Sequence, residues 1–159
     1  MGPLIGHGLF GDVIRAMNLS TGEIFAVKRL DLYINKTELN REAIKTLKAE
    51  IEVLKNHTHE NIVGYVGSEI VSGRFCIYLE CVSEGSVQSI YTQFGPLKES
   101  VIKRYTKHIL KGLRYLHENG IIHHDLKGAN VLVDSTGVVK LSDFGCSTLV
   151  SASLDKSEG

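Results

Sequence analysis

The residues of this chain that could do chemistry gather between positions 123 and 145. In chain order they are His123-His124-Asp125-Leu126-Lys127-Gly128-Ala129-Asn130 and, with Asp143 thirteen positions after Asn130, Asp143-Phe144-Gly145. Phosphoryl transfer requires a base near the incoming hydroxyl, oxygen ligands for a metal ion, and a cation that offsets the charge of the phosphate. Carboxylates, a lysine and an amide at these spacings supply those groups. The segment therefore indicates a phosphoryl-transfer site.

Each of these side chains suits a separate task. Asp125 would orient the substrate hydroxyl and accept its proton, while Lys127 would neutralise the γ-phosphate. Asn130 and Asp143 would offer an amide oxygen and a carboxylate to magnesium, which prefers hard oxygen ligands. We expect His123 to pack and hydrogen-bond locally. The histidines of the chain lack the cysteines and the spacing of a zinc site, so zinc is not expected.

A glycine-rich loop near the start of the chain could bind phosphate. Its residues are Gly6-His7-Gly8-Leu9-Phe10-Gly11-Asp12-Val13. Glycines let backbone N–H groups approach phosphate oxygens closely, although such a loop taken alone can also be a purely structural turn. A dinucleotide-binding fold, with Asp31 as its acidic residue, would need a helix opening at the last glycine. Positions 12–30 read instead as strand, turn and strand, which argues against that fold.

Lys28 lies on a predicted strand, with Ala26 as its neighbour on the same face. Alanine is small enough to leave room for a flat ligand, whereas a strand lysine taken alone is usually just solvated. A glutamate on the following helix could pair with Lys28. Glu50 is the first choice because it borders the apolar face of that helix. Glu42 and Glu52 remain the alternatives.

Several elements must position these residues. Alternating apolar residues, glycine-rich runs and turn signals predict a strand-rich half, with strands over 5–11, 13–17, 23–30, 62–70 and 75–82, and two short later strands over 130–133 and 138–141. Apolar residues at helical spacing predict long helices over 36–56 and 99–118. The loop Ser83-Glu84-Gly85-Ser86 coincides with a shift in composition. We expect the boundary between two lobes there.

Composition narrows the class of protein. Hydrophobic residues make up 43% and charged residues 23%, and 18 basic side chains balance 18 acidic ones. No global field therefore attracts nucleic acid, and no apolar run is long enough for membrane insertion. The three cysteines form no C-x-x-C pair, and their odd number favours a reducing compartment. A cytoplasmic location is expected.

From about Leu4 to Thr148 the chain resembles the eukaryotic protein kinase catalytic domain. Glycine loop, strand lysine, helix glutamate, D-x-K-x-x-N and D-F-G follow one another in the order of that family. Lys127 resembles the serine/threonine branch. Four stretches look most like the MAP kinase kinase kinase group: His59-Glu60-Asn61-Ile62-Val63, Gly85-Ser86-Val87, Lys127-Gly128-Ala129-Asn130 and Asp143-Phe144-Gly145-Cys146-Ser147.

The resemblance implies an α+β, two-lobed fold that binds ATP and Mg2+. Residues 1–82 would form the antiparallel-sheet small lobe and hinge, 83–145 the start of a helical large lobe, and 146–159 a truncated, disordered activation segment. The catalytic residues would be Asp125, Lys127, Lys28 and Glu50, and the metal ligands Asn130 and Asp143. ATP would contact Ile5, Gly6, His7, Gly8, Leu9, Phe10, Gly11, Val13, Ala26, Lys28, Leu79, Glu80, Val82 and Leu132. Glu80 to Val82 would be the hinge, and the spine between the lobes would comprise Leu54, Tyr65, His123 and Phe144.

Two departures from the family pattern qualify these expectations. His124 replaces an arginine that in the family docks the phosphorylated activation segment, so we expect phosphorylation there to activate the chain weakly. The candidate phosphosites are Ser147, Thr148, Ser151 and Ser153. No A-P-E sequence follows, so the chain is expected to be a kinase fragment or truncated product. It would then expose an apolar stripe of its second long helix and be marginally stable alone.

The resulting functional prediction is ATP-dependent phosphorylation of serine or threonine hydroxyls in a kinase cascade. The substrate would be a protein such as a downstream kinase, and an upstream kinase would act on this chain. The alternative is a truncated or inactive kinase-like module that only binds a nucleotide or a partner.

Overall fold

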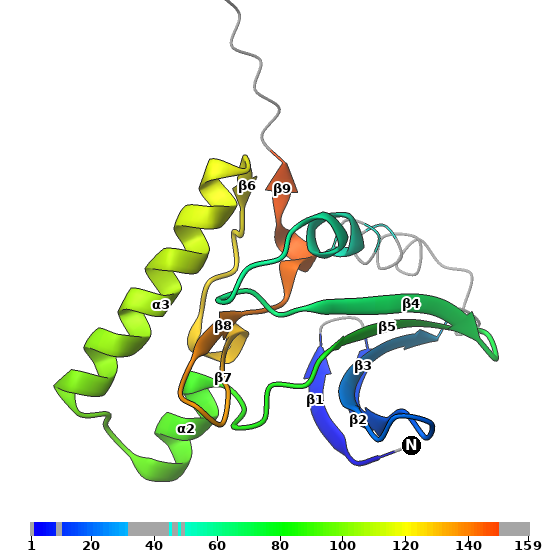
Figure 1. Cartoon of the computed structure of the whole chain (residues 1–159), viewed down its shortest axis with the longest axis horizontal. Coiled ribbons are helices and arrows are strands. Elements are labelled where there is room, and N and C mark those ends of the chain that lie inside the picture. Colours follow the sequence, from blue (N-terminus) through cyan, green and yellow to red (C-terminus); the bar gives the residue numbers. More distant parts are fainter. Residues whose placement is uncertain (1, 9–10, 32–44, 46–47, 49, 150–159) are drawn as a thin grey trace, which may run out of the picture.

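A five-stranded antiparallel sheet and a group of helices and short strands make up the protein (Figure 1). The computed structural model describes residues 2–8, 11–31, 45, 48 and 50–149. The sheet contains strands β1 (Leu4–Gly8), β2 (Gly11–Met17), β3 (Ile24–Asp31), β4 (Tyr65–Val71) and β5 (Arg74–Glu80), in the order β1-β2-β3-β5-β4. The predicted α+β architecture with an antiparallel-sheet lobe is confirmed.

The register of the sheet decides which side chains share a face. Val13 in β2 lies opposite Lys28 in β3, and Arg15 lies opposite Ala26. Ala26 in turn lies opposite Leu79 of β5. Directly opposed residues in an antiparallel pair point to the same side of the sheet, as do residues two apart on one strand. These five residues therefore project from one face, which is the face that bears the site.

Local backbone chemistry explains the hairpin between β4 and β5. Ser72 and Gly73 have φ values of 48° and 72° at its centre. Two consecutive residues with positive φ make the tight turn whose twist matches that of paired strands. The strand predicted over 62–70 begins later than expected, at Tyr65, because Ile62 makes an isolated parallel bridge to Leu141 instead of joining the sheet.

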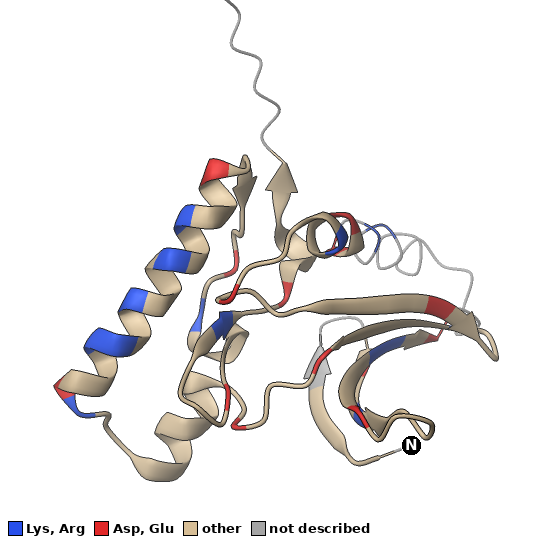
Figure 2. Ribbon diagram, viewed as in Figure 1, with Lys and Arg blue, Asp and Glu red and all other residues tan. Residues whose placement is uncertain are grey.

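The long helix α3 spans Glu99–Glu118, as the apolar spacing predicted. It buries Gly112 and Leu116, whereas Ile102 and Leu110 are 50% and 59% exposed on the outer side. Basic side chains recur along this helix (Figure 2). Of the helix predicted over 36–56, the described residues 45, 48 and 50–56 are helical.

A shorter helix, α2 (Val87–Phe94), was missed by the sequence reading. None of its residues is fully buried, although Val87 and Ile90 pack, partly buried, against the apolar core. Its start is fixed by Ser86 and Ser89, whose side chains each accept a hydrogen bond from the backbone N–H of the other. Serine at the second position of this capping box is less recognisable than the usual glutamate or glutamine.

Short elements complete the helical half. They are the strands β6 (Ile121–Ile122), β7 (Val131–Val133), β8 (Val139–Leu141) and β9 (Thr148–Leu149) and the 3-10 turns Gly128–Asn130 and Phe144–Cys146. β7 pairs with β8, and β6 pairs with β9. Asn130 belongs to a turn and not to the predicted strand over 130–133. Within the part of the chain that the structure describes, no helix combines the length and apolar character needed to cross a membrane.

The core lies between the helical residues 50–56, α3 and the short strands. Leu54, Ile62, Leu116, Leu141 and Phe144 are all at most 2% exposed and belong to one apolar cluster. Burial of such side chains is the main favourable term in folding. The cluster includes Leu141 of β8 and Phe144 of the D-F-G segment and thereby holds both segments in place.

Candidate active site

A cavity of ≈ 520 Å³ lies between the sheet and the short strands β7 and β8. Eight of the predicted ATP contacts line it: Ile5, Val13, Ala26, Lys28, Leu79, Glu80, Val82 and Leu132. Residues of β1, β2, β3 and β5 form one wall, and Leu132 of β7 lies on the other. Of the remaining predicted contacts, Gly6, His7 and Gly8 lie on β1 and Gly11 opens β2. Leu9 and Phe10 are outside the described residues.

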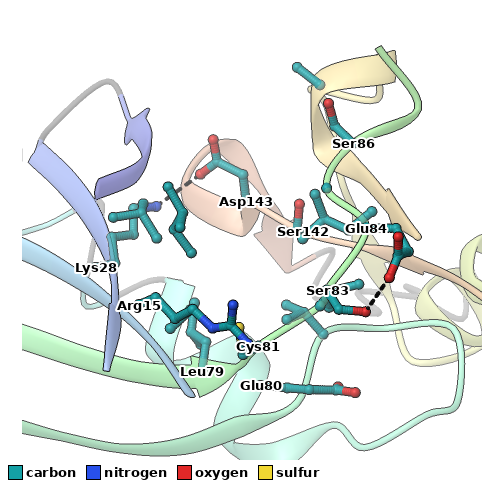
Figure 3. A pocket seen from close by; sticks show the side chains of 18 of the residues that line it. Arg15, Lys28, Leu79, Glu80, Cys81, Ser83, Glu84, Ser86, Ser142 and Asp143 are labelled. Carbon is teal, nitrogen blue, oxygen red and sulfur yellow. Dashed lines mark hydrogen bonds and ion pairs between the residues drawn. The ribbon is translucent and has the colours of Figure 1, made fainter. Parts of the chain in front are cut away.

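The cavity has further lining residues that the sequence reading did not include. They are Arg15, Val63, Ser83, Glu84, Gly85, Ser86, Ser89, Ala129 and Ser142, whereas Cys81, which also lines the cavity, belongs to the predicted hinge. Arg15 could have been found, because it lies two positions after Val13 on the same face of β2. Figure 3 shows Arg15 on the side of the cavity where Cys81 and Ser83 lie. Val63 and Ser142 gave no local signal, because the tertiary fold alone brings them to the cavity.

Lys28 links two carboxylates from distant parts of the chain, and Figure 3 marks its contact with one of them, Asp143. Its Nζ lies 2.7 Å from Glu50 Oε2 and 3.0 Å from Asp143 Oδ1. The Lys28 side chain is only 8% exposed. Burial alone would lower the pKa of Lys28, but attraction to Glu50 and Asp143 raises it above its ordinary value. Lys28 is therefore a fixed cation at neutral pH.

Glu50 is the helix carboxylate that meets Lys28. Its side chain is 1% exposed, while Glu52 points to solvent and Glu42 lies outside the described residues. Burial raises the pKa of Glu50, and the neighbouring lysine opposes that effect. The pair thus joins the helix to β3 through a contact that water hardly reaches.

Asp125 is held by two donors in the loop between β6 and β7. Lys127 Nζ lies 2.8 Å and Asn130 Nδ2 lies 2.9 Å from Asp125 Oδ2. The hydrogen bond from Lys127 is the main reason why the pKa of Asp125 lies below its ordinary value. A carboxylate kept ionised and fixed in direction can accept a proton from a hydroxyl.

Asn130 and Asp143 are brought together by Ser142. Its N–H and its hydroxyl both donate to the backbone carbonyl of Asn130, at 2.9 and 3.1 Å. The side chain of Asn130 bonds to Asp125 through Nδ2, which leaves its amide oxygen for another partner. Asp143 is 37% exposed and adopts φ 63°, which turns its carboxylate toward Lys28. A carboxylate and an amide oxygen are ligands that suit a hard divalent cation.

Aromatic and apolar side chains support this loop from beneath. His123 Nε2 lies 3.0 Å from the carbonyl oxygen of Ser142, and the ring centroids of His123 and Phe144 are 4.9 Å apart. Leu54 and Phe144 belong to the main apolar cluster, with Tyr65 packed against it. The residues predicted to form a spine are thus close together, and His123 packs as expected.

His124 directly precedes Asp125 and faces the segment after D-F-G. Its Nε2 lies 2.7 Å from the hydroxyl of Thr148 in β9. The residue has φ 61°, a conformation that non-glycine residues adopt at some cost. The sequence-based expectation that phosphorylation of this segment activates weakly stays a prediction, now with Thr148 as the hydroxyl in contact with His124.

Comparison with known proteins identifies the family. The model of the protein kinase domain matches residues 1–158. The chain is 50% identical over 145 residues to "Mitogen-activated protein kinase kinase kinase 5" of Arabidopsis thaliana, covering 91% of this chain and 20% of that protein. It is 46% identical over 147 residues to "Mitogen-activated protein kinase kinase kinase A" of Dictyostelium discoideum, covering 92% and 16%.

A third relative, which has a different name, is similar to nearly the whole length of this chain. "Cell division control protein 7" of Schizosaccharomyces pombe is 41% identical over 157 residues, which cover 99% of this chain and 14% of that protein. The chain thus spans only a small part, 14% to 20%, of the length of these three relatives. The match to the kinase model over nearly the whole chain agrees with the order of its motifs. The chain belongs to the protein kinase domain family.

Proposed function

We propose that this chain transfers the γ-phosphoryl group of ATP to serine or threonine hydroxyls of a protein. The observation that supports this most is the contact of Lys28 with both Glu50 and Asp143, at 2.7 and 3.0 Å. This contact places a fixed cation at the inner end of a cavity lined by apolar residues. A purine fits between such apolar walls, and its phosphates would extend toward the cation.

The described residues divide the work of the reaction. Lys28 binds the phosphates nearest the cavity, and Glu50 fixes the direction of the Lys28 side chain. Asp125 accepts the hydroxyl proton while the new P–O bond forms, and the bond from the γ-phosphorus to the β–γ bridging oxygen breaks. Lys127, next to Asp125, offsets the charge of the transferring group.

Divalent-metal dependence is expected of the protein kinase family, and we propose Mg2+ as the ion. Asn130 and Asp143 would hold it, since their oxygens lie on adjoining segments beside the cavity. Bound metal would shield the phosphate charge. We further propose a downstream kinase as the substrate, an upstream kinase as the activator and a cytoplasmic location. The names of the relatives and the odd number of cysteines support these assignments.

The test compares the full chain with Asp125→Asn in an assay that uses radiolabelled ATP and a basic protein substrate. The substitution keeps the shape of the side chain but removes the proton acceptor, so transfer should fall by roughly 10²- to 10⁴-fold. Binding of MgADP should change little, because Asp125 does not line the cavity. Asp31→Asn, at a surface pair with Arg74, is the matched control and should keep the activity.

Two outcomes would contradict the proposal. Equal transfer by the parent and by Asp125→Asn would remove Asp125 from the mechanism. A parent chain that binds MgADP but transfers no phosphate would support the alternative of a nucleotide-binding module.

A further inference from the structure

Glu80 is the last residue of β5 and lies at the hinge edge of the cavity. Its side chain contacts Gly64 and Lys140. Figure 3 shows the Glu80 side chain well apart from Lys28 and Asp143. Its carboxylate is shared between two segments: Oε2 accepts the N–H of Gly64 at 3.0 Å, and Oε1 lies 3.1 Å from Lys140 Nζ. The Glu80 N–H also donates to the Gly64 carbonyl, at 2.8 Å.

Through Lys140, the Glu80 side chain is connected to the half of the molecule that contains β7 and β8. Lys140 lies in β8, directly opposite Leu132, which lines the cavity. Its side chain is 13% exposed, compared with 38% for Glu80. A charge pair with one partly buried member is less screened by salt and water than a fully exposed pair. The pair therefore joins the hinge to β8, the strand that pairs with the cavity-lining strand β7.

The same strand leads directly to the candidate metal ligand. Leu141 follows Lys140, and Ser142 and Asp143 come next. Leu141 donates its N–H to the carbonyl of Asn61 and accepts from the N–H of Val63, both at 2.9 Å. The segment before β4 is thus bound to β8 on one side and to Glu80 on the other.

Gly64 makes the close approach of Glu80 possible. A Cβ atom at this position would lie 3.3 Å from Glu80 Oε2 and 3.5 Å from Glu80 Cβ. A side chain at position 64 would therefore press against the carboxylate and shift it. Because position 64 has no side chain, Glu80 can contact both Gly64 and Lys140. These contacts hold the hinge, segment 61–64 and β8 together.

We propose that Glu80 is a positioning residue whose carboxylate fixes β8, and through it Asp143, relative to the hinge backbone. The hinge would meet the purine, and Asp143 would meet the metal and phosphates. Glu80 thereby sets the separation between the two ends of the nucleotide site without contacting the phosphates. This inference rests on the proposed function, because it requires a nucleotide that spans the cavity.

The test measures binding of MgADP and of adenosine to the full chain and to Glu80→Gln. Glutamine can still accept the Gly64 N–H, but it loses the charge that holds Lys140. The Kd for MgADP should rise about fivefold. The Kd for adenosine, which has no phosphates, should stay unchanged within measurement error. Glu99→Gln, which removes an exposed ion pair with Lys103 in α3, is the matched control and should change neither value.

Lys140→Met probes the same contact from its other side. It should weaken MgADP binding as Glu80→Gln does, and the double variant should be no weaker than either single variant, because all three lack the same contact. This series also keeps the test valid if one variant folds poorly by circular dichroism.

Three results would overturn the inference: an unchanged Kd for MgADP, an equal loss of adenosine binding, or additive effects of the two substitutions. A parent chain that does not bind MgADP would instead contradict the proposed function, so the two failures can be told apart.

Discussion

Lys28 is a charged side chain in a place that water hardly reaches, so its partners decide its energy. Glu50 is still more buried, at 1% exposure, and Lys28 compensates its negative charge. Removing one member of a buried pair leaves the other uncompensated, which costs more than the pair itself contributes. Loss of the Lys28–Glu50 contact should therefore lower the stability of the fold as well as weaken phosphate binding.

We expect Lys28→Met to destabilise the fold by about 2–3 kcal/mol at pH 7.5. Without the lysine, burial raises the pKa of Glu50 further, so the folded state binds a proton more tightly than the unfolded state, whose pKa is near 4.5. Stability is then lost as pH rises above that value. At pH 5 protonation limits the penalty to roughly 1 kcal/mol or less.

Urea unfolding of parent and variant at the two pH values measures this difference. Lys103→Met, which removes an exposed pair with Glu99, serves as the control and should cost under about 1 kcal/mol at both. A Lys28→Met penalty that is equal at pH 5 and pH 7.5 would show that Glu50 is not left as a buried charge.

At the scale of elements, α3 is positioned by the absence of a side chain. Gly112 lies where the helix meets β8 and the segment before β4. A Cβ atom there would come within 2.8 Å of the Asn61 carbonyl oxygen and 3.0 Å of Leu141 Cδ1. One of these neighbours is backbone, so it cannot move aside easily.

Gly112→Ala has two opposite effects on the free energy of unfolding. Alanine improves helix propensity by about 1 kcal/mol, whereas overpacking costs typically 1–3 kcal/mol. Because the nearest atom belongs to the backbone, we expect the clash to win and the free energy of unfolding to fall by about 1–2 kcal/mol. Lys111→Ala, on the exposed side of the same helix, should stay within roughly 0.5 kcal/mol of the parent. Thermal or urea unfolding checks both, and a stabilised Gly112→Ala would contradict the packing shown here.

At the scale of the whole molecule, the cavity is lined by residues from both the sheet and the helical half. Val13 and Ala26 come from the sheet, Val82 from the hinge, Leu132 from β7 and Asp143 from the D-F-G segment. A ligand that touches all of them joins the two halves of the protein. Binding should therefore stabilise both halves together.

We expect MgADP at about 100 times its Kd to stabilise the folded chain by about 2.7 kcal/mol, as mass action requires. Hydrogen exchange should slow in β3 and in β8 alike. Magnesium alone at the same concentration is the control and should have a much smaller effect. Protection confined to β3 or to β8 would show that the nucleotide does not bridge the two halves.

The sequence by itself determined the family, most strands and the long helix α3. These depend on local patterns: the alternation of apolar residues, the helical spacing over 99–118 and the order of the motifs around Lys28, Asp125 and Asp143. It did not determine α2, because that helix is only eight residues long and begins at an unusual serine capping box.

Only the tertiary structure decided which glutamate faces Lys28 and what the Glu80 side chain does. Glu50 and Glu52 lie on one helix, and the packing of that helix buries one and exposes the other. Glu80 was expected at the hinge for its backbone, whereas its carboxylate meets Gly64 and Lys140. Such contacts join residues far apart in the chain. Their geometry follows from sheet register and packing, which no local spacing of residue types encodes.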